Sequence, residues 1–184
     1  MDDDAFRLYY GATWLNLPAT LTGRRRLPLI ERLTSPQRLA EWLAAVGLTP
    51  QEPPTDDDVT AAIELRDALY EMSRAAVEDR RPEGGAIRIL NIAAAQDSPP
   101  ALRIERGELV ASAPTTTADA LGRIARQAAE HLTGPERARL RACADATCAG
   151  VYLDESGRRR WCADATCGVR NRVRAHRARQ TDPG

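Results

Sequence analysis

Cys143-Ala-Asp-Ala-Thr-Cys148 and Cys162-Ala-Asp-Ala-Thr-Cys167 are two copies of one hexapeptide, and together they contain every cysteine of the chain. Each copy has the spacing Cys-x4-Cys, and thirteen residues separate the copies. Four thiolates can surround one zinc ion as a tetrahedron and leave no coordination position open for a substrate. The pattern therefore predicts one structural zinc ion bound by Cys143, Cys148, Cys162 and Cys167.

The rest of the sequence favours a reducing, non-membrane setting for these cysteines. No stretch approaches the roughly 18 apolar residues that span a membrane. The start, Met1 to Asp4, is acidic where a signal peptide would be basic. We expect a cytoplasmic protein, in which thiols stay reduced and clustered cysteines bind metal rather than form disulfides.

The formal net charge of zero conceals two regions of opposite charge. Residues 1–136 hold 15 Arg and 21 Asp and Glu, a difference of −6, and residues 137–184 hold 11 Arg and 5 Asp and Glu, a difference of +6. All basic residues are Arg, which a GC-rich genome would explain equally well. The asymmetry is more informative, because a basic end on an acidic body indicates an anionic partner.

The first 135 residues are predicted to be mainly α-helical with one β-hairpin. A helix over 36–46 is capped by Ser35, starts at Pro36 and stops at Gly47. Its apolar side chains share one face: Leu39, Trp42, Leu43 and Val46. Gly134-Pro135 ends the region.

Further helices are predicted over 59–77 and 117–132, with the acidic run Asp56 to Asp58 at the positive end of the first helix dipole. Residues 87–95 favour a helix, although a strand is an alternative. Residues 101–113 indicate a hairpin with its turn near Arg106-Gly107. The apolar segment 12–21 gives no clear secondary structure.

The C-terminal module is predicted to be a small α+β unit. Short strands are expected at 140–142 and 151–153, a returning segment at 158–161, and a helix from Asp164 or Thr166 to about Gln180. Such a module has little core of its own, so the metal should supply on the order of 10 kcal/mol of its folding free energy. We expect the N-terminal helices to have a separate core and to survive loss of the metal.

The run from Leu140 to Arg179, with both cysteine pairs and Cys167-Gly168-Val169-Arg170, resembles the CGNR zinc finger. Leu15-Asn16-Leu17, Leu39 to Gly47 and Leu90-Asn91 are similar to the ABATE domain that usually precedes this finger. The resemblance implies an ABATE-like helical domain over 1–135, a treble-clef or ribbon-like finger over 138–181, and a stress-responsive, DNA-binding transcription regulator. One residue departs from the Cys-Gly-Asn-Arg motif that gives the finger its name: Val169 stands in the position of the Asn.

The last predicted helix carries the candidate nucleic-acid contacts. Its arginines fall in two rows, which suit a major groove or a phosphate track: Arg170, Arg174 and Arg177 in one, Arg172 and Arg179 in the other. A solvated basic face, or one docked on the acidic body, is the alternative. Val169, Val173 and His176 form a stripe that we expect to pack on the strands of the module.

Other polar residues are interpreted as structural. Asp145 and Asp164 should accept backbone N–H bonds within their turns, His131 should favour the negative end of a helix dipole, and Trp14 and Trp42 should lie in the core. No catalytic constellation is found, so we expect no enzyme activity.

These observations predict a zinc-dependent DNA-binding regulator whose N-terminal domain senses a small-molecule effector or forms a homodimer. The alternative is a protein- or RNA-interaction module with a purely structural zinc site.

Overall fold

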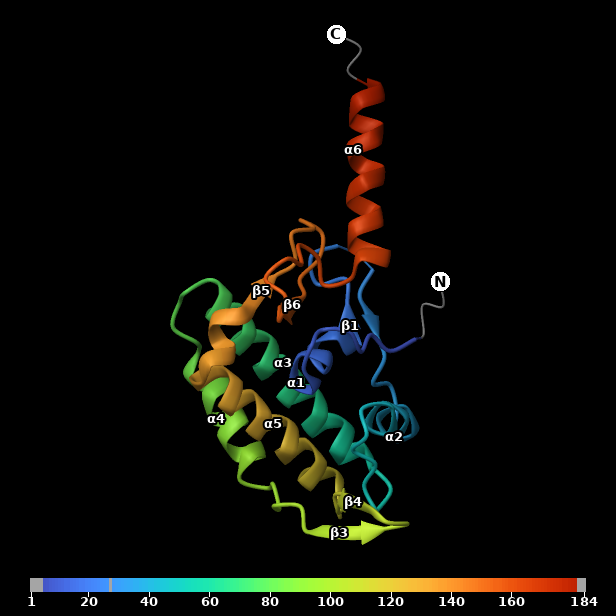
Figure 1. Cartoon of the computed structure of the whole chain (residues 1–184), viewed down its shortest axis with the longest axis vertical. Coiled ribbons are helices and arrows are strands. Elements are labelled where there is room, and N and C mark those ends of the chain that lie inside the picture. The colour runs from blue at the N-terminus through green and yellow to red at the C-terminus, as the bar shows by residue number, and fades with distance from the viewer. Residues whose placement is uncertain (1–4, 27, 182–184) are drawn as a thin grey trace.

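The computed structural model describes residues 5–26 and 28–181 and shows a helical body with one long helix standing away from it (Figure 1). The acidic run Met1 to Asp4, which argued against a signal peptide, lies outside the described residues. Among the described residues, no helix is both long and apolar enough to cross a membrane.

The predicted mainly α fold with small sheets is confirmed. In chain order the body contains α1 (Thr13–Asn16), η1 (Pro18–Thr20), β1 (Leu21–Thr22), β2 (Ile30–Glu31), α2 (Pro36–Ala45), α3 (Asp56–Val77), α4 (Gly84–Ala94), β3 (Leu102–Glu105), β4 (Glu108–Ala111) and α5 (Thr117–Thr133). The C-terminal part contains η2 (Pro135–Arg139), β5 (Leu140–Ala142), β6 (Val151–Leu153), η3 (Asp164–Gly168) and α6 (Val169–Thr181). In the described part of the chain, three antiparallel pairs form the sheets: β1–β2, β3–β4 and β5–β6.

Side-chain caps fix where the main helices begin. Ser35 accepts a hydrogen bond from Arg38 N, as predicted, and Thr116 caps α5 in the same way from Asp119 N. The helix predicted from residue 59 begins at Asp56, because Thr55 and Asp58 form a reciprocal capping box that includes the acidic run in the first turn. The segment predicted over 87–95 is helical up to Ala94, as favoured, and its helix starts at Gly84.

Helices α3, α4 and α5 pack on one another, and α1 lies against α3 and α5. The two predicted core tryptophans, Trp14 and Trp42, are fully buried. His131 is in the last turn of α5, but its Nδ1 also accepts a hydrogen bond from Trp14 Nε1 at 3.1 Å. This contact fixes α1, the segment whose structure the sequence leaves open.

The hairpin at the far end of the body has the expected turn but little burial. Arg106 and Gly107 both have positive φ, 51° and 85°, as a two-residue type I′ turn requires. All four residues of β3 are exposed, so this hairpin contributes little to the core.

The expectation that the body and the C-terminal module have separate cores is wrong. One continuous core contains Trp14 and α3 side chains together with Val151, Tyr152 and Cys162. Strands β5 and β6 contact α3, and Leu153 N donates to Tyr10 O at 2.8 Å. The finger is therefore packed on the body and is not joined to it by a linker alone.

The local structure of the finger matches the sequence pattern except in the returning segment. Strands β5 and β6 occupy 140–142 and 151–153, as predicted. Residues 158–161 form no strand. Ala144 N of the neighbouring loop donates a hydrogen bond to Arg160 O at 2.9 Å. This segment turns the chain toward the second cysteine pair instead of widening the sheet.

Gly122 of α5 lies against the backbone of the loop after α4. A Cβ at this position would lie 2.5 Å from Asp97 N and 3.0 Å from Gln96 C. We expect Gly122→Ala to destabilise the protein by about 1–3 kcal/mol through this clash, despite the better helix propensity of alanine. Gly85→Ala in α4 is the matched control: a Cβ there meets no heavy atom within 4 Å, so it should be neutral or stabilising by about 0.5–1 kcal/mol. Urea unfolding of both variants checks this, and equal behaviour would contradict it.

Candidate metal centre and basic helix

The four cysteines come from two loops that the fold brings together. Cys143 directly follows β5, and Cys148 lies in the loop before β6. Cys162 follows the returning segment, and Cys167 lies in η3. All four are free thiols with their Sγ atoms within 4.8 Å of one another.

The sulfur spacing is that of a tetrahedral zinc site. Zn–S bonds of about 2.3 Å require S···S separations of about 3.8 Å. Cys162 Sγ lies 3.7 Å from Cys148 Sγ and 3.6 Å from Cys167 Sγ. The donor set and its spacing fit one structural zinc ion, and four protein ligands leave no position for a substrate.

The thiols cannot all ionise without a cation among them. Hydrogen bonds from Cys148 and then from Cys162 lower the pKa of Cys143, whereas the interaction with Cys143 raises the pKa of Cys162. Thiolates at this separation repel one another, and a divalent ion removes that repulsion. When bound, zinc would cross-link the two loops.

Hydrogen-bond donors surround the sulfurs and favour their ionised form. Gly150 N points at Cys148 Sγ at 3.3 Å, and Cys162 N points at Cys143 Sγ at 3.5 Å. Arg170 Nη2 lies 3.1 Å from Cys167 Sγ. Because four thiolates and Zn²⁺ would carry a net charge of −2, this guanidinium offsets part of the charge.

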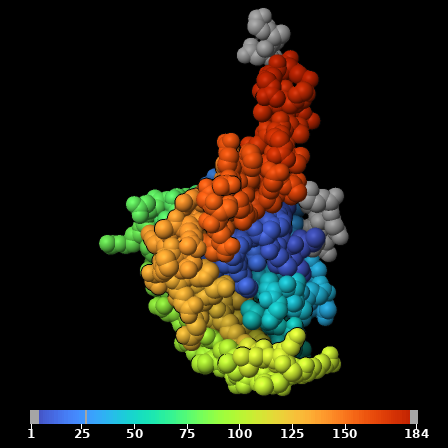
Figure 2. Space-filling model, in the orientation of Figure 1, coloured from blue at the N-terminus to red at the C-terminus, as the bar shows by residue number. Residues whose placement is uncertain are grey.

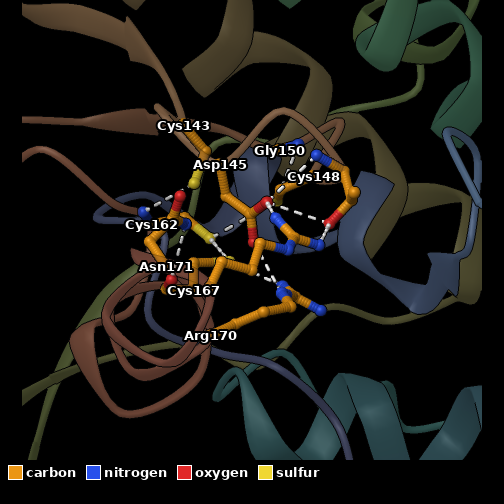
Figure 3. A network of polar contacts seen from close by, with 10 residues as sticks. Cys143, Asp145, Cys148, Gly150, Cys162, Cys167, Arg170 and Asn171 are labelled. Carbon is orange, nitrogen blue, oxygen red and sulfur yellow. Dashed lines mark hydrogen bonds and ion pairs between the residues drawn. The ribbon is translucent and has the colours of Figure 1, made fainter. Parts of the chain in front are cut away.

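Asp145 connects the first cysteine pair to the base of α6. Its carboxylate is fully buried and accepts from Thr147 N at 3.0 Å, as the turn prediction requires. It also accepts from Arg170 Nε at 2.6 Å (Figure 3). A further bond comes from Arg174 Nη1 at 2.9 Å. Burial raises the pKa of Asp145, but the hydrogen bonds from Thr147, Arg170 and Arg174 outweigh burial and lower it.

The second knuckle differs from the first, and the turn prediction for Asp164 is wrong. In the structure its carboxylate pairs with the Arg172 guanidinium, Oδ1 to Nη1 at 2.9 Å and Oδ2 to Nη2 at 3.0 Å. Both side chains are more than half exposed. The loop around Cys162 is instead held by Arg159, whose Nη2 bonds Tyr9 O at 3.1 Å and Cys162 O at 2.5 Å.

Two sets of side-chain contacts in the finger were not predicted from the sequence. Asn171 Nδ2 donates to Cys167 O at 2.8 Å and so closes the start of α6. Tyr152 donates to Arg159 O at 2.6 Å, and the Arg159 guanidinium lies 4.5 Å from the Tyr152 ring centroid. A Tyr and an Arg seven residues apart give no signal by themselves, because the loop between them brings them together.

The predicted apolar stripe of the last helix is also wrong. Val169 is 44% exposed, Val173 is 42% exposed and His176 is exposed. The helix leaves the finger at its base and extends into solvent (Figures 1 and 2), so the strands of the finger do not cover this face. The spacing of the apolar residues predicted which side chains share a face of α6, but it did not predict that this face is exposed to solvent.

The five candidate arginines of α6 differ in their contacts. Arg170 and Arg174 point back to Asp145, and Arg172 pairs with Asp164. These ion pairs are all to acids of the finger and not to acids of residues 1–136. Arg177 and Arg179 lie farther along α6, where every described side chain from residue 172 to 180 is exposed.

Comparison with known families gives two adjacent matches. The ABATE family, whose description is "Putative stress-induced transcription regulator", matches residues 11–135. The family described as "CGNR zinc finger" matches residues 139–180. A search of curated proteins finds no match. The chain therefore belongs to the ABATE family and carries a CGNR zinc finger with four clustered cysteines at its C-terminal end.

Proposed function

We propose that this protein is a zinc-dependent, DNA-binding transcription regulator in which α6 contacts DNA, and that it is not an enzyme. The observation that carries the proposal is the position of α6. An arginine-rich helix that stands in solvent, with its base fixed to a metal-binding loop, has the form of an element that enters a groove or follows a phosphate track.

The contacts of the arginines support two different roles within this helix. Arg170 is 25% exposed and bonds Asp145 and Cys167 Sγ, so it positions the helix. Arg174, 45% exposed, shares Asp145. Arg172, Arg177 and Arg179 are exposed. Arg172 pairs with the exposed Asp164 carboxylate at the second knuckle, and the other two lie farther along the helix. We propose these three as the principal phosphate contacts, with Arg174 at the margin.

The salt dependence of DNA binding tests these contacts. Arg172→Ala, Arg177→Ala and Arg179→Ala together should weaken binding to duplexes of any sequence by roughly 100-fold at low salt. Each lost contact should also flatten the plot of log K against log salt by about 0.9. Fluorescence anisotropy with zinc-loaded protein and a labelled duplex measures both quantities.

Arg103→Ala is the control, because Arg103 lies in the exposed hairpin at the opposite end of the body from α6 (Figure 1). This variant should bind as the unmodified chain does. Triple-variant binding equal to that of the unmodified chain would reject α6 as the DNA contact.

The alternative function is an interaction module for protein or RNA with a purely structural zinc ion. The bonds of Arg170 and Arg174 to Asp145 favour it, because they show that part of the basic row stabilises the finger. Competition of the labelled duplex by unlabelled single-stranded RNA distinguishes the two functions. Preference for RNA, or binding to neither, would favour the alternative.

The helical body is proposed to provide sensing or dimerisation. Its core is continuous with the finger, so a ligand or partner that changes the body could change the base of α6 as well.

A further inference from the structure

A cavity of about 60 Å³ lies where the body meets the metal-binding loop. The body contributes Arg7, Tyr70 of α3, and Gly23, Arg24 and Arg26 of the loop between β1 and β2. The finger contributes the loop from Thr147 to Val151, which contains the zinc ligand Cys148, and Arg170 at the base of α6. A ligand in this cavity would touch both parts of the protein.

The wall of the cavity is positively charged. Among the residues that the structure describes, four arginines line it, Arg7, Arg24, Arg26 and Arg170, and no Asp or Glu does. For the side chains of Arg7 and Arg26, no ion pair is found within residues 5–26 and 28–181. Two of the four positive charges are therefore uncompensated by any carboxylate in the described structure.

The other two arginines are held in place by acids behind the wall. Arg24 Nη2 bonds Asp67 Oδ1 at 2.5 Å, and its guanidinium lies 4.2 Å from the Tyr70 ring centroid. Asp67 also accepts from Arg66 Nε at 3.2 Å, just as Asp145 serves both Arg170 and Arg174. Shared acids neutralise their partners incompletely.

The charges of the metal centre and of Glu31 also act on this wall. Arg7, Arg24, Arg26, Arg66, Arg170 and Arg174 are six positive charges. Asp67, Asp145 and Glu31, which pairs with Arg66 at 2.6 Å, are three negative charges, and a zinc tetrathiolate adds two. Among these groups one positive charge remains in excess, and the two arginines without an ion pair to the described residues are Arg7 and Arg26.

The remaining lining limits the size and type of ligand. Hydroxyl groups of Thr22 and Thr147 and apolar side chains such as Leu15 and Val151 complete the wall. Since one water needs about 10–15 Å³ measured in this way, the volume accommodates a group of only a few heavy atoms. Guanidinium groups bind carboxylate and phosphate oxygens in forked geometry.

We propose that this cavity binds a small oxyanion, a carboxylate or phosphate group, between the arginines of the β1–β2 loop and Arg170. The oxyanion links the body to the base of α6 and stabilises their contact. Two sources offer this chemistry, a free small anion and a phosphate of bound DNA. The regulatory meaning of the site rests on the proposed DNA-binding function, whereas oxyanion binding itself does not.

Arg25 and Arg26 provide a matched pair of variants. Both side chains are exposed neighbours in the same loop, but only Arg26 lines the cavity. Inorganic phosphate is titrated into the zinc-loaded full chain by calorimetry and by thermal unfolding, with chloride at equal ionic strength as the reference. We expect saturable binding and a higher Tm with phosphate, binding about tenfold weaker in Arg26→Ala, and no change in Arg25→Ala.

Equal effects of the two substitutions, or equal Tm values in phosphate and chloride, would overturn the proposal. Acetate in a parallel titration extends it to carboxylates: saturable binding sensitive to Arg26→Ala supports a general oxyanion site, and its absence overturns the carboxylate part.

Duplex binding separates the two sources. If DNA phosphate occupies the cavity, Arg26→Ala flattens the salt slope by about one unit while Arg25→Ala does not, and phosphate competes with the duplex. If a free anion is the ligand, Arg26→Ala leaves duplex affinity in phosphate-free buffer unchanged but abolishes the effect of added phosphate on it, as linkage requires. If no duplex binds at all, the proposed function fails, and the phosphate titration still decides the oxyanion site.

Discussion

Cys162→Ser is expected to destabilise the helical body as well as to unfold the finger. Structural zinc contributes about 10–16 kcal/mol to the folding of small zinc modules, which is comparable with the whole stability of an ordinary domain, about 5–15 kcal/mol. Cys162 is 1% exposed and belongs to the same core as Trp14 and Tyr152. Loss of this ligand should lower the free energy of unfolding by more than about 5 kcal/mol.

The expected extent of unfolding follows from the contacts between the two parts. Strands β5 and β6 cover α3, and the backbone bond from Leu153 N to Tyr10 O joins β6 to the start of the body. Once the loops around the metal separate, the body loses this cover. Hydrogen exchange should therefore become faster in α1 and α3 as well as in residues 138–181.

Zinc content, thermal unfolding by circular dichroism and amide exchange measure this result. A chelator added to the unmodified chain should reproduce the variant, and added zinc should restore the unmodified chain but not Cys162→Ser. Unchanged exchange in α1 and α3 of the variant would show that the body is independent of the finger after all.

Asp145→Ala is expected to give the second-largest effect, although Asp145 is not a metal ligand. Its buried carboxylate holds Arg170 and Arg174 and also accepts from Thr147 N. Removing one partner of a buried charge network costs about 3–5 kcal/mol, because the other charges remain without compensation. The base of α6 should lose its attachment to the first zinc knuckle.

The effect of this substitution on DNA affinity has an informative sign. If α6 were only a basic tail, removal of a negative charge would strengthen DNA binding. If α6 must be held by the finger, the same substitution weakens binding, and we expect a weakening of about tenfold or more. Anisotropy at a temperature where the variant is still folded measures it, and tighter binding would contradict the anchoring role.

Asp164→Ala is the matched control for Asp145→Ala. Asp164 also pairs with an arginine of α6, but its side chain is 67% exposed. Exposed ion pairs contribute about 0–1 kcal/mol, so stability should change little. DNA binding should become slightly stronger, because Arg172 loses its internal partner.

Local sequence patterns were sufficient for the existence of the longer helices and for the metal ligands, but not for α1. Ser35 and the stripe around Trp42 define α2 because capping and periodicity act within a few residues of the chain. The hairpin turn follows from Arg106-Gly107 for the same reason. The repeated Cys-x4-Cys spacing predicted the cysteine cluster because the two closely spaced pairs contain every cysteine of the chain.

Tertiary structure alone decided the environment of these elements. The sequence predicted which residues share a face of α6 but not that Val169 and Val173 face solvent, because exposure depends on what packs nearby. Asp145 contacts Arg170 and Arg174 only because the first cysteine loop lies beside the start of α6, 25 residues or more away in the chain. Likewise, the shared core and the arginine-lined cavity join segments from both ends of the protein. Such contacts depend on packing between distant segments, and local propensity and spacing carry no information about that packing.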